Sequence, residues 1–326
     1  MKIKTINKIC LFFVCLALPL SVFASRTEMQ NNVPNRGDFP IGPTSFDLKV
    51  QRGESLSETL EITNRSGKEQ SYKVEVEDFE GSTTDPTQAS NLKGSMAGKY
   101  GAKNWLTPEV KNFSLQHGER FFMEVKIQVP MSADFGDHYG AVLVSSLDPS
   151  QVKSSSGVNV MITSRVGSLF LLRVDGPIVE KGSLESFTTN KSFYEKGPID
   201  FQVIYKNEGT VRLLPSGAIT VKNLLGQTTD KIQIENFKVL RDSQRLNNLV
   251  LKKKNLFGRY TATVALDRGY GNIVDTKSIT FWVFPVKESV AVIVLLVFIL
   301  FFTLMLIRKR KHNSNKGKLK REKKNG

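Results

Sequence analysis

Few residues in this sequence have the chemistry to catalyse a reaction or to bind a metal ion. The histidines are His117, His138 and His312, and the two cysteines are Cys10 and Cys15. Both cysteines lie in an N-terminal apolar run that we expect to be removed, so the mature chain would contain no thiol and no disulfide. We therefore expect no catalytic residue, no cofactor and no metal site, and we predict that the protein is not an enzyme.

The densest cluster of polar groups is Asp134, Asp137 and His138. Carboxylates and imidazoles bind metal ions, but this spacing matches neither a zinc motif nor an EF-hand loop. We interpret the cluster as a turn that leads into the next strand. His117 lies between Gln116 and Gly118 and is interpreted as an exposed turn residue.

Known catalytic and phosphate-binding motifs are absent from the sequence. It contains no Gly-x-Ser-x-Gly elbow and no Walker-type loop. A pair of catalytic carboxylates, as in a glycosidase, stays open as an alternative, although no pair is identified. The cationic run Lys252–Lys254 is interpreted as a solvated turn, with contact to an anionic wall polymer or to lipid headgroups as the alternative.

The segments around these residues are predicted to be β-strands, because apolar and polar residues alternate along them. In Phe121–Val129 the apolar residues alternate with Glu, Lys and Gln, and Ile199–Tyr205 alternates in the same way. Two blocks of about seven such strands, separated by turn signals, predict an all-β protein: two immunoglobulin-like β-sandwiches in tandem, plus one C-terminal transmembrane α-helix. In 158–174 the alternation is long for one strand, so Gly167 is expected to mark a bulge or a break.

Both ends of the chain carry targeting signals. A basic start, an apolar run and Val22-Phe23-Ala24 predict a signal peptide cut after Ala24. The uncharged run Val290–Ile307 would be ~27 Å long as a helix, enough to cross a bilayer with its flanks. Ten of the 46 Lys and Arg residues lie in 308–326. Much of the net charge of +15 therefore marks a cytoplasmic tail, and we expect no nucleic acid as a partner.

These signals predict six segments along the chain. In order, they are a signal peptide (1–24), a flexible lead-in (25–42), the first sandwich (43–175), the second sandwich (176–285), a transmembrane helix (286–307) and a basic cytoplasmic tail (308–326). Residues 80–104 interrupt the first sandwich with a Gly- and Ser-rich stretch that has no clear period. Loops of this length are often functional, so we expect 80–104 to contribute to binding.

This layout resembles the WxL-interacting proteins of the bacterial envelope. The similar residues are turns and strand starts: Leu60–Ser66, Gly118-Glu119 before Phe121–Val129, Gly136 to Gly140, Lys206–Gly209, Leu224–Gly226 and Phe257–Tyr260. The resemblance implies a non-enzymatic role in binding wall or surface partners, with peptidoglycan among them. It does not supply binding residues.

We therefore predict a single-pass plasma-membrane protein whose ectodomain lies outside and whose tail lies in the cytoplasm. Its partners would be the lipid bilayer, through residues 290–307, and an unidentified cell-wall polymer or envelope protein. It would act as a binding or scaffold protein of the envelope. The alternative is a protein like the two-domain periplasmic chaperones, which donate a strand to secreted subunits. The ligand and the oligomeric state stay open.

Overall fold

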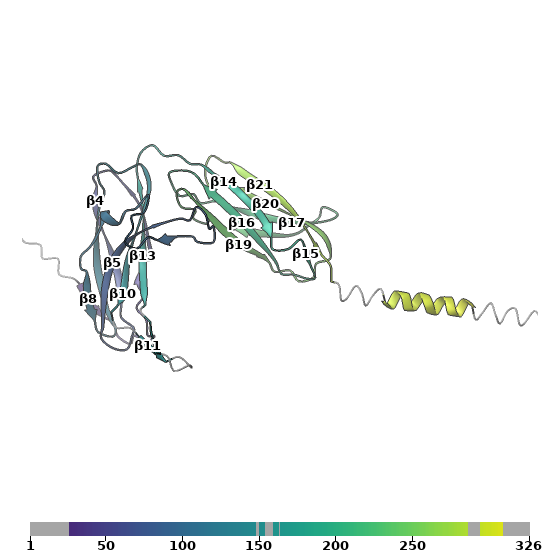
Figure 1. Cartoon of the computed structure of the whole chain (residues 1–326), viewed down its shortest axis with the longest axis horizontal. Helices are drawn as coiled ribbons and strands as arrows, with labels where there is room; N and C mark the ends of the chain where they lie inside the picture. Colours follow the sequence, from purple (N-terminus) through teal and green to yellow (C-terminus); the bar gives the residue numbers. More distant parts are fainter. Residues whose placement is uncertain (1–25, 148–149, 154–158, 163, 286–293, 309–326) are drawn as a thin grey trace, which may run out of the picture.

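The chain forms two β-sandwiches followed by a helix. The computed structural model describes residues 26–147, 150–153, 159–162, 164–285 and 294–308. The sandwiches meet at an angle, and the helix lies beyond the far end of the second one (Figure 1). The predicted signal peptide and most of the predicted tail fall outside the described residues. The prediction of an all-β, immunoglobulin-like protein is confirmed for the two sandwiches.

The first sandwich packs two sheets against each other. One sheet has the order β1-β9-β4-β2, with β7 also paired to β9, and the other has the order β3-β13-β10-β5-β6, with β8 paired to β5. A separate hairpin, β11-β12, stands between β10 and β13. The bounds are β1 Arg26–Met29, β2 Ile41–Gly42, β3 Ser45–Val50, β4 Ser55–Thr63, β5 Gln70–Glu80, β6 Asn91–Leu92, the 3-10 helix η1 Lys103–Trp105, β7 Leu106–Pro108, β8 Asn112–Leu115, β9 Glu119–Gln128, β10 Gly136–Ser146, β11 Ser150–Lys153, β12 Asn159–Ile162 and β13 Arg165–Val174.

The second sandwich has a small sheet and a larger one. The small sheet has the order β14-β16-β19, and the larger sheet has the order β15-β21-β20-β17-β18. The bounds are β14 Gly182–Thr189, β15 Phe193–Tyr194, β16 Ile199–Asn207, β17 Ser216–Asn223, β18 Thr228–Ile234, β19 Ser243–Leu251, β20 Gly258–Asp267 and β21 Val274–Val283.

The predicted alternation determines which side chains form the cores. On β9 the buried residues are Phe121 and every second residue after it, and on β16 they begin at Ile199. Burying a large apolar side chain contributes about 1.5–3 kcal/mol, so each strand fixes the face that it turns inward. A shift of one residue would expose the whole apolar set.

Strand β10 differs because it is buried on both faces along its whole length. One face packs into the first core. The other face carries Tyr139, Ala141 and Leu143, which pack with Phe79 and with Leu240 of the second sandwich. The apolar run of β10 therefore reflects cover on both faces, as in the fully buried strands of other sheets.

Two local predictions in the first block are wrong. Residues 25–42 are not a flexible lead-in throughout: β1 pairs with β9 and β2 pairs with β4, which fits the alternative of a first edge strand. The side chains of β1 are exposed, so its backbone pairing leaves no apolar pattern in the sequence. Gly167 breaks no strand: it lies inside β13, opposite Leu143. A Cβ built on Gly167 would overlap the Leu143 Cδ2 atom, so this glycine allows close side-chain packing.

The predicted single-pass membrane anchor is also wrong. Among the described residues no helix is long and apolar enough to cross a membrane. Residues 290–293 of the predicted span lie outside the described part. The transmembrane helix, the bilayer contact through residues 290–307 and the plasma-membrane localisation are therefore not retained.

Candidate functional site

The polar cluster singled out in the sequence serves the junction between the two sandwiches. Asp137 is fully buried, and its carboxylate accepts hydrogen bonds from Arg173 Nε at 2.8 Å and from Arg212 Nη1 at 2.6 Å. Arg212, which belongs to the second sandwich, also forms an ion pair with Asp47. In the described residues no group of three metal-ligating side chains comes together.

Burial dominates the electrostatics of this junction. It raises the pKa of the Asp137 carboxyl, although Arg173 and the Arg212 backbone N–H act in the opposite direction. It lowers the pKa of the Arg212 guanidinium to about 10. Both charged forms thus bear a desolvation cost, and their mutual contact offsets it. The junction links the two sandwiches, since Asp137 of the first sandwich and Arg212 of the second are each other's most buried charged partner.

His117 and the run Lys252–Lys254 were both predicted to lie in turns. His117 braces a turn: its Nδ1 accepts from the Gly67 N–H at 3.1 Å, and its Nε2 lies 3.0 Å from the Val33 carbonyl. Its side chain is half-buried, where the sequence predicts exposure. Lys252–Lys254 are exposed between β19 and β20, as a solvated turn would be.

His138 is a buried residue of the same junction. Its ring lies 4.5 Å from that of Trp105, and its Nε2 lies 2.9 Å from the Asp134 carbonyl. The Nδ1 atom has no partner among the described residues, and burial lowers the pKa of the ring. Asp134 contacts His138 through its backbone, so these side chains do not converge on a ligand.

Residues 80–104 fold back over the outer face of the sheet that contains β10. The Asp78 carboxylate accepts from the backbone N–H groups of Gly98 at 2.9 Å and Lys103 at 2.7 Å. The same segment reaches β19 of the second sandwich, where the Gln244 N–H donates to the Ser82 carbonyl at 2.8 Å and Lys99 pairs with Asp242 at 2.6 Å. The segment thus joins the two sandwiches and covers part of this face.

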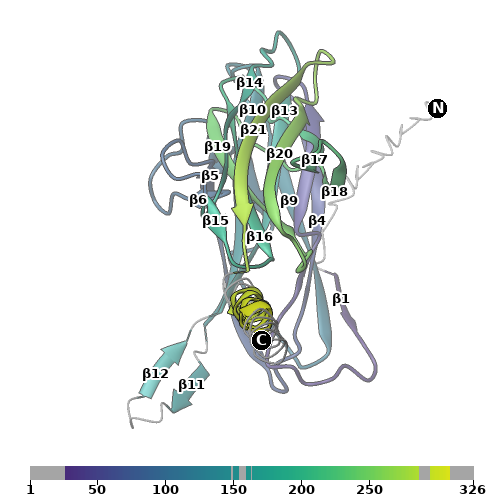
Figure 2. The ribbon, with the colours of Figure 1, turned by 90° about the vertical axis from the view of Figure 1, so that its right-hand side faces the viewer.

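A free strand edge lies beside this covered face. β3 pairs in parallel with β13 only from Leu169 onward, so residues 165–167 have no strand on that side in the described part of the chain. We call this gap the notch. The edge continues toward the β11-β12 hairpin, which projects away from the first sandwich in both views (Figures 1 and 2). Within the described residues β11 and β12 pair only with each other.

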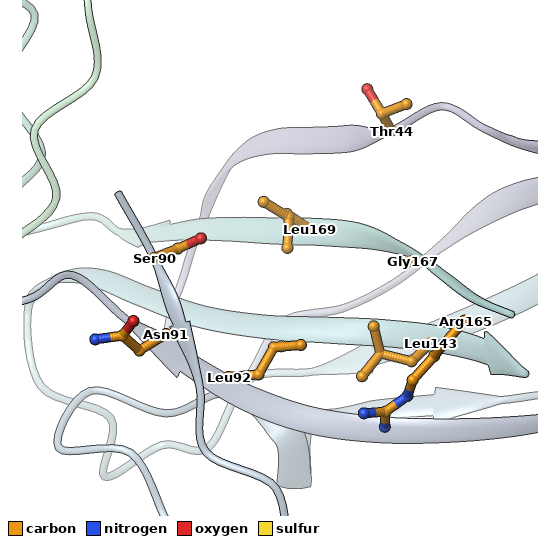
Figure 3. A pocket seen from close by; sticks show the side chains of 8 residues that line it. All are labelled: Thr44, Ser90, Asn91, Leu92, Leu143, Arg165, Gly167 and Leu169. Carbon is orange, nitrogen blue, oxygen red and sulfur yellow. The ribbon is translucent and has the colours of Figure 1, made fainter. Parts of the chain in front are cut away.

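The notch opens onto an apolar groove on the outer face of the sheet. The groove has a volume of about 720 Å³ and is lined by Thr44, Ser90, Asn91, Leu92, Leu143, Arg165, Gly167 and Leu169. In Figure 3, Leu169 and Leu143 come from neighbouring strands and Leu92 approaches from β6. Arg165 reaches down to Glu77 and, at 3.5 Å, to Glu75. The groove therefore combines three leucines with the polar residues Thr44, Ser90 and Asn91 and the charged rim residue Arg165, next to the free edge of β13.

The sequence reasoning named Asp137, His138 and the segment 80–104, but it missed their partners Arg173 and Arg212 at the junction and did not predict the groove. One signal was present for Arg212, because a single Arg within the apolar run Val211–Leu214 indicates a buried charge that needs a partner. No such signal marks the groove. Its walls come from segments more than 100 residues apart, and only the folded sheet brings them together.

The comparisons with known proteins give structural likenesses alone. No family model and no curated protein matches the chain. The chaperone CfaA of class 5 fimbriae is 15% identical, with 76% of this chain and 100% of that chain covered and a TM-score of 0.37. The E. coli chaperone DraB is 12% identical (76% and 98% covered, TM-score 0.33), and the PapD-like domain 7 of human CEP192 is 12% identical (48% and 98%, TM-score 0.29). At such identities and scores the chain is assigned to no family, and the resemblance to WxL-interacting proteins stays a prediction.

Proposed function

We propose that this chain is a two-domain, chaperone-like protein that binds an incompletely folded secreted subunit by strand addition at the notch. The observation that carries this proposal is the free edge of β13 at residues 165–167, which continues toward the projecting β11-β12 hairpin. An extended partner segment can pair with such an edge through its backbone, whatever its side chains are. This role needs no catalytic residue, and the predicted signal peptide would bring the chain to the compartment of secreted subunits.

The notch differs from an ordinary sheet edge. Exposed edges invite uncontrolled pairing, and proteins usually shorten, charge or cover them. Here β3 begins at Ser45, opposite Leu169, and covers β13 as far as Val174. The free stretch before Leu169 is therefore short and bounded at one end by β3. A partner strand would continue the line of β3 and complete the row of backbone bonds. A bounded edge therefore favours one register over many.

The alternative of a membrane-anchored wall scaffold is not favoured. Its anchor is not found among the described residues. The segment that we expected to bind, residues 80–104, makes backbone and ion-pair contacts with β19 and with Asp242 before it. Its residues Ser90, Asn91 and Leu92 also line the groove beside the notch, so part of this segment belongs to the candidate binding surface.

Site-specific crosslinking tests the proposal. A photoreactive residue would replace Arg165 in the full chain, which would be co-expressed in an extracytoplasmic compartment with a secreted β-sandwich subunit lacking its last strand. The matched control places the same residue at Thr228, an exposed position on the edge strand β18 of the second sandwich. We expect a crosslink from position 165 and none from position 228. Equal crosslinking from both positions, or none from 165, would contradict strand addition at the notch.

A further inference from the structure

The apolar groove beside the notch has a geometry that an extended partner segment would use. The Leu169 N–H donates to the Thr44 carbonyl at 3.0 Å, so the backbone groups of Leu169 point toward β3. Backbone direction repeats every second residue along a strand, and Gly167 therefore directs its N–H and C=O into the notch. The free backbone groups and the groove lie side by side at this one residue.

Side chains on neighbouring strands share a face at paired positions. A partner residue beside Gly167 would point its side chain to the outer face of the sheet, because residues directly opposite each other in a sheet point the same way. Gly167 has no side chain to occupy this space, and Leu143 leans over it from β10. The incoming side chain would thus meet Leu143, Leu169 and Leu92.

The groove is only partly covered. Toward the junction the same face is closed by Leu240, which is 6% exposed; at the groove Leu143 is 5% exposed, whereas Leu92 is 48% exposed. Arg165 pairs with Glu77 and Glu75, so its charge is compensated at the rim. An apolar surface with a compensated rim favours an apolar occupant over a charged one.

We propose that the groove takes one large apolar side chain, such as Phe, Leu or Met, from the segment that pairs with the notch, and that it selects which segment binds. This inference rests on the proposed strand addition and adds a specificity site to it. The volume of about 720 Å³ lies within the range of small-ligand pockets, so even an aromatic ring fits. Backbone pairing with the notch would give affinity that does not depend on the partner's sequence. The groove would add a preference for partner segments with a large apolar side chain at this position.

Two peptides test the selection in the full chain. Both are nine-residue Thr-rich peptides that differ only at the central position, which is Phe in one and Ala in the other. Affinity is measured by fluorescence anisotropy, and pairing is measured by hydrogen exchange at the amides of Arg165 and Gly167. Burial of an aromatic side chain predicts about 10- to 100-fold tighter binding of the Phe peptide, with protection of both amides.

A variant locates the preference in the groove. Leu92→Ala removes one wall on the two-residue strand β6 and should reduce the preference for Phe several-fold without changing the affinity for the Ala peptide. Leu225→Ala, at an 81% exposed turn position, is the matched control and should change neither. Protection of both amides with equal affinity for the two peptides would overturn the groove proposal and leave strand addition intact. Absence of protection with either peptide would overturn both.

Discussion

The buried charge junction gives the sharpest prediction about this protein. Asp137→Asn keeps the volume of the side chain and removes its charge. Arg212, whose side chain is 7% exposed, then keeps only the 45% exposed Asp47 as a carboxylate partner. Removing one partner of a buried pair costs about 3–5 kcal/mol, because the remaining charge stays desolvated. We expect the free energy of unfolding to fall by about this amount.

The matched control is an exposed ion pair of similar geometry. Asp38 pairs with Arg65 at 2.7 Å, and its side chain is 49% exposed. Exposed pairs contribute about 0–1 kcal/mol, so Asp38→Asn should change stability by less than ~1 kcal/mol. The contrast between the two variants separates the effect of burial from that of pairing.

A second substitution tests the reason for the loss. In the double variant Asp137→Asn/Arg212→Met no unpaired charge remains between these two residues, since replacing a buried pair by apolar groups is often neutral. We therefore expect the double variant to lose about 1–3 kcal/mol less than the sum of the two single variants.

Urea unfolding followed by tryptophan fluorescence measures these effects. Trp105 is 8% exposed and packs on His138 beside the junction, whereas Trp282 is 46% exposed on β21 of the second sandwich. The signal of Trp105 can be isolated with a Trp282→Phe background. A loss below ~1 kcal/mol for Asp137→Asn, or strict additivity in the double variant, would refute the reasoning.

Three further predictions concern single positions in the two sandwiches. Because burial lowers the pKa of His138, its contribution to stability is complete above about pH 6.5 and is lost as the pH falls through that value toward the lower folded-state pKa. His138→Phe should remove this loss, measured as the difference in unfolding free energy between about pH 7 and about pH 5, and an unchanged difference would contradict the assignment. The Asn207 Nδ2 donates to three buried carbonyls, so Asn207→Ala should cost about 2–3 kcal/mol by urea titration, while the exposed Asn248→Ala should cost little; similar costs would argue against the buried bonds. Gly167→Ala should destabilise by about 1–3 kcal/mol through overlap with Leu143, and Leu143→Ala in the same chain should relieve part of that loss; additive losses in thermal unfolding would exclude the overlap.

Strands whose two faces meet different surroundings were predictable from the sequence. β9 and β16 each have one face in a core, so their apolar residues alternate. β14 was missed because a register shift between Leu184 and Ser186 breaks the alternation and buries Leu184 and Phe187, three residues apart. β19 was missed because it is polar and mostly half-buried, which leaves no period to detect.

Turn residues were recognised as turns, but their structural role was not. Asn64 and Asn207 were predicted to begin turns, and both have their Nδ2 groups buried against backbone carbonyls. Asn64 donates to Lys68 and Leu115, the latter 51 residues away. Such bonds depend on which loop packs against the turn, and this packing cannot be predicted from the local sequence.

The all-β class, the strands with one buried face and the scarcity of catalytic groups could be predicted, because they follow from side-chain type and from a period of two. The bilayer anchor that hydropathy indicated is not found among the described residues. Three features follow from the folded structure and not from local sequence: Asp137 meets Arg212, residues 80–104 cover a sheet face, and β3 begins opposite Leu169. Each of these contacts joins segments far apart in the chain. The physical reason is that the burial and the pairing of a residue depend on which distant residues pack against it in the folded protein.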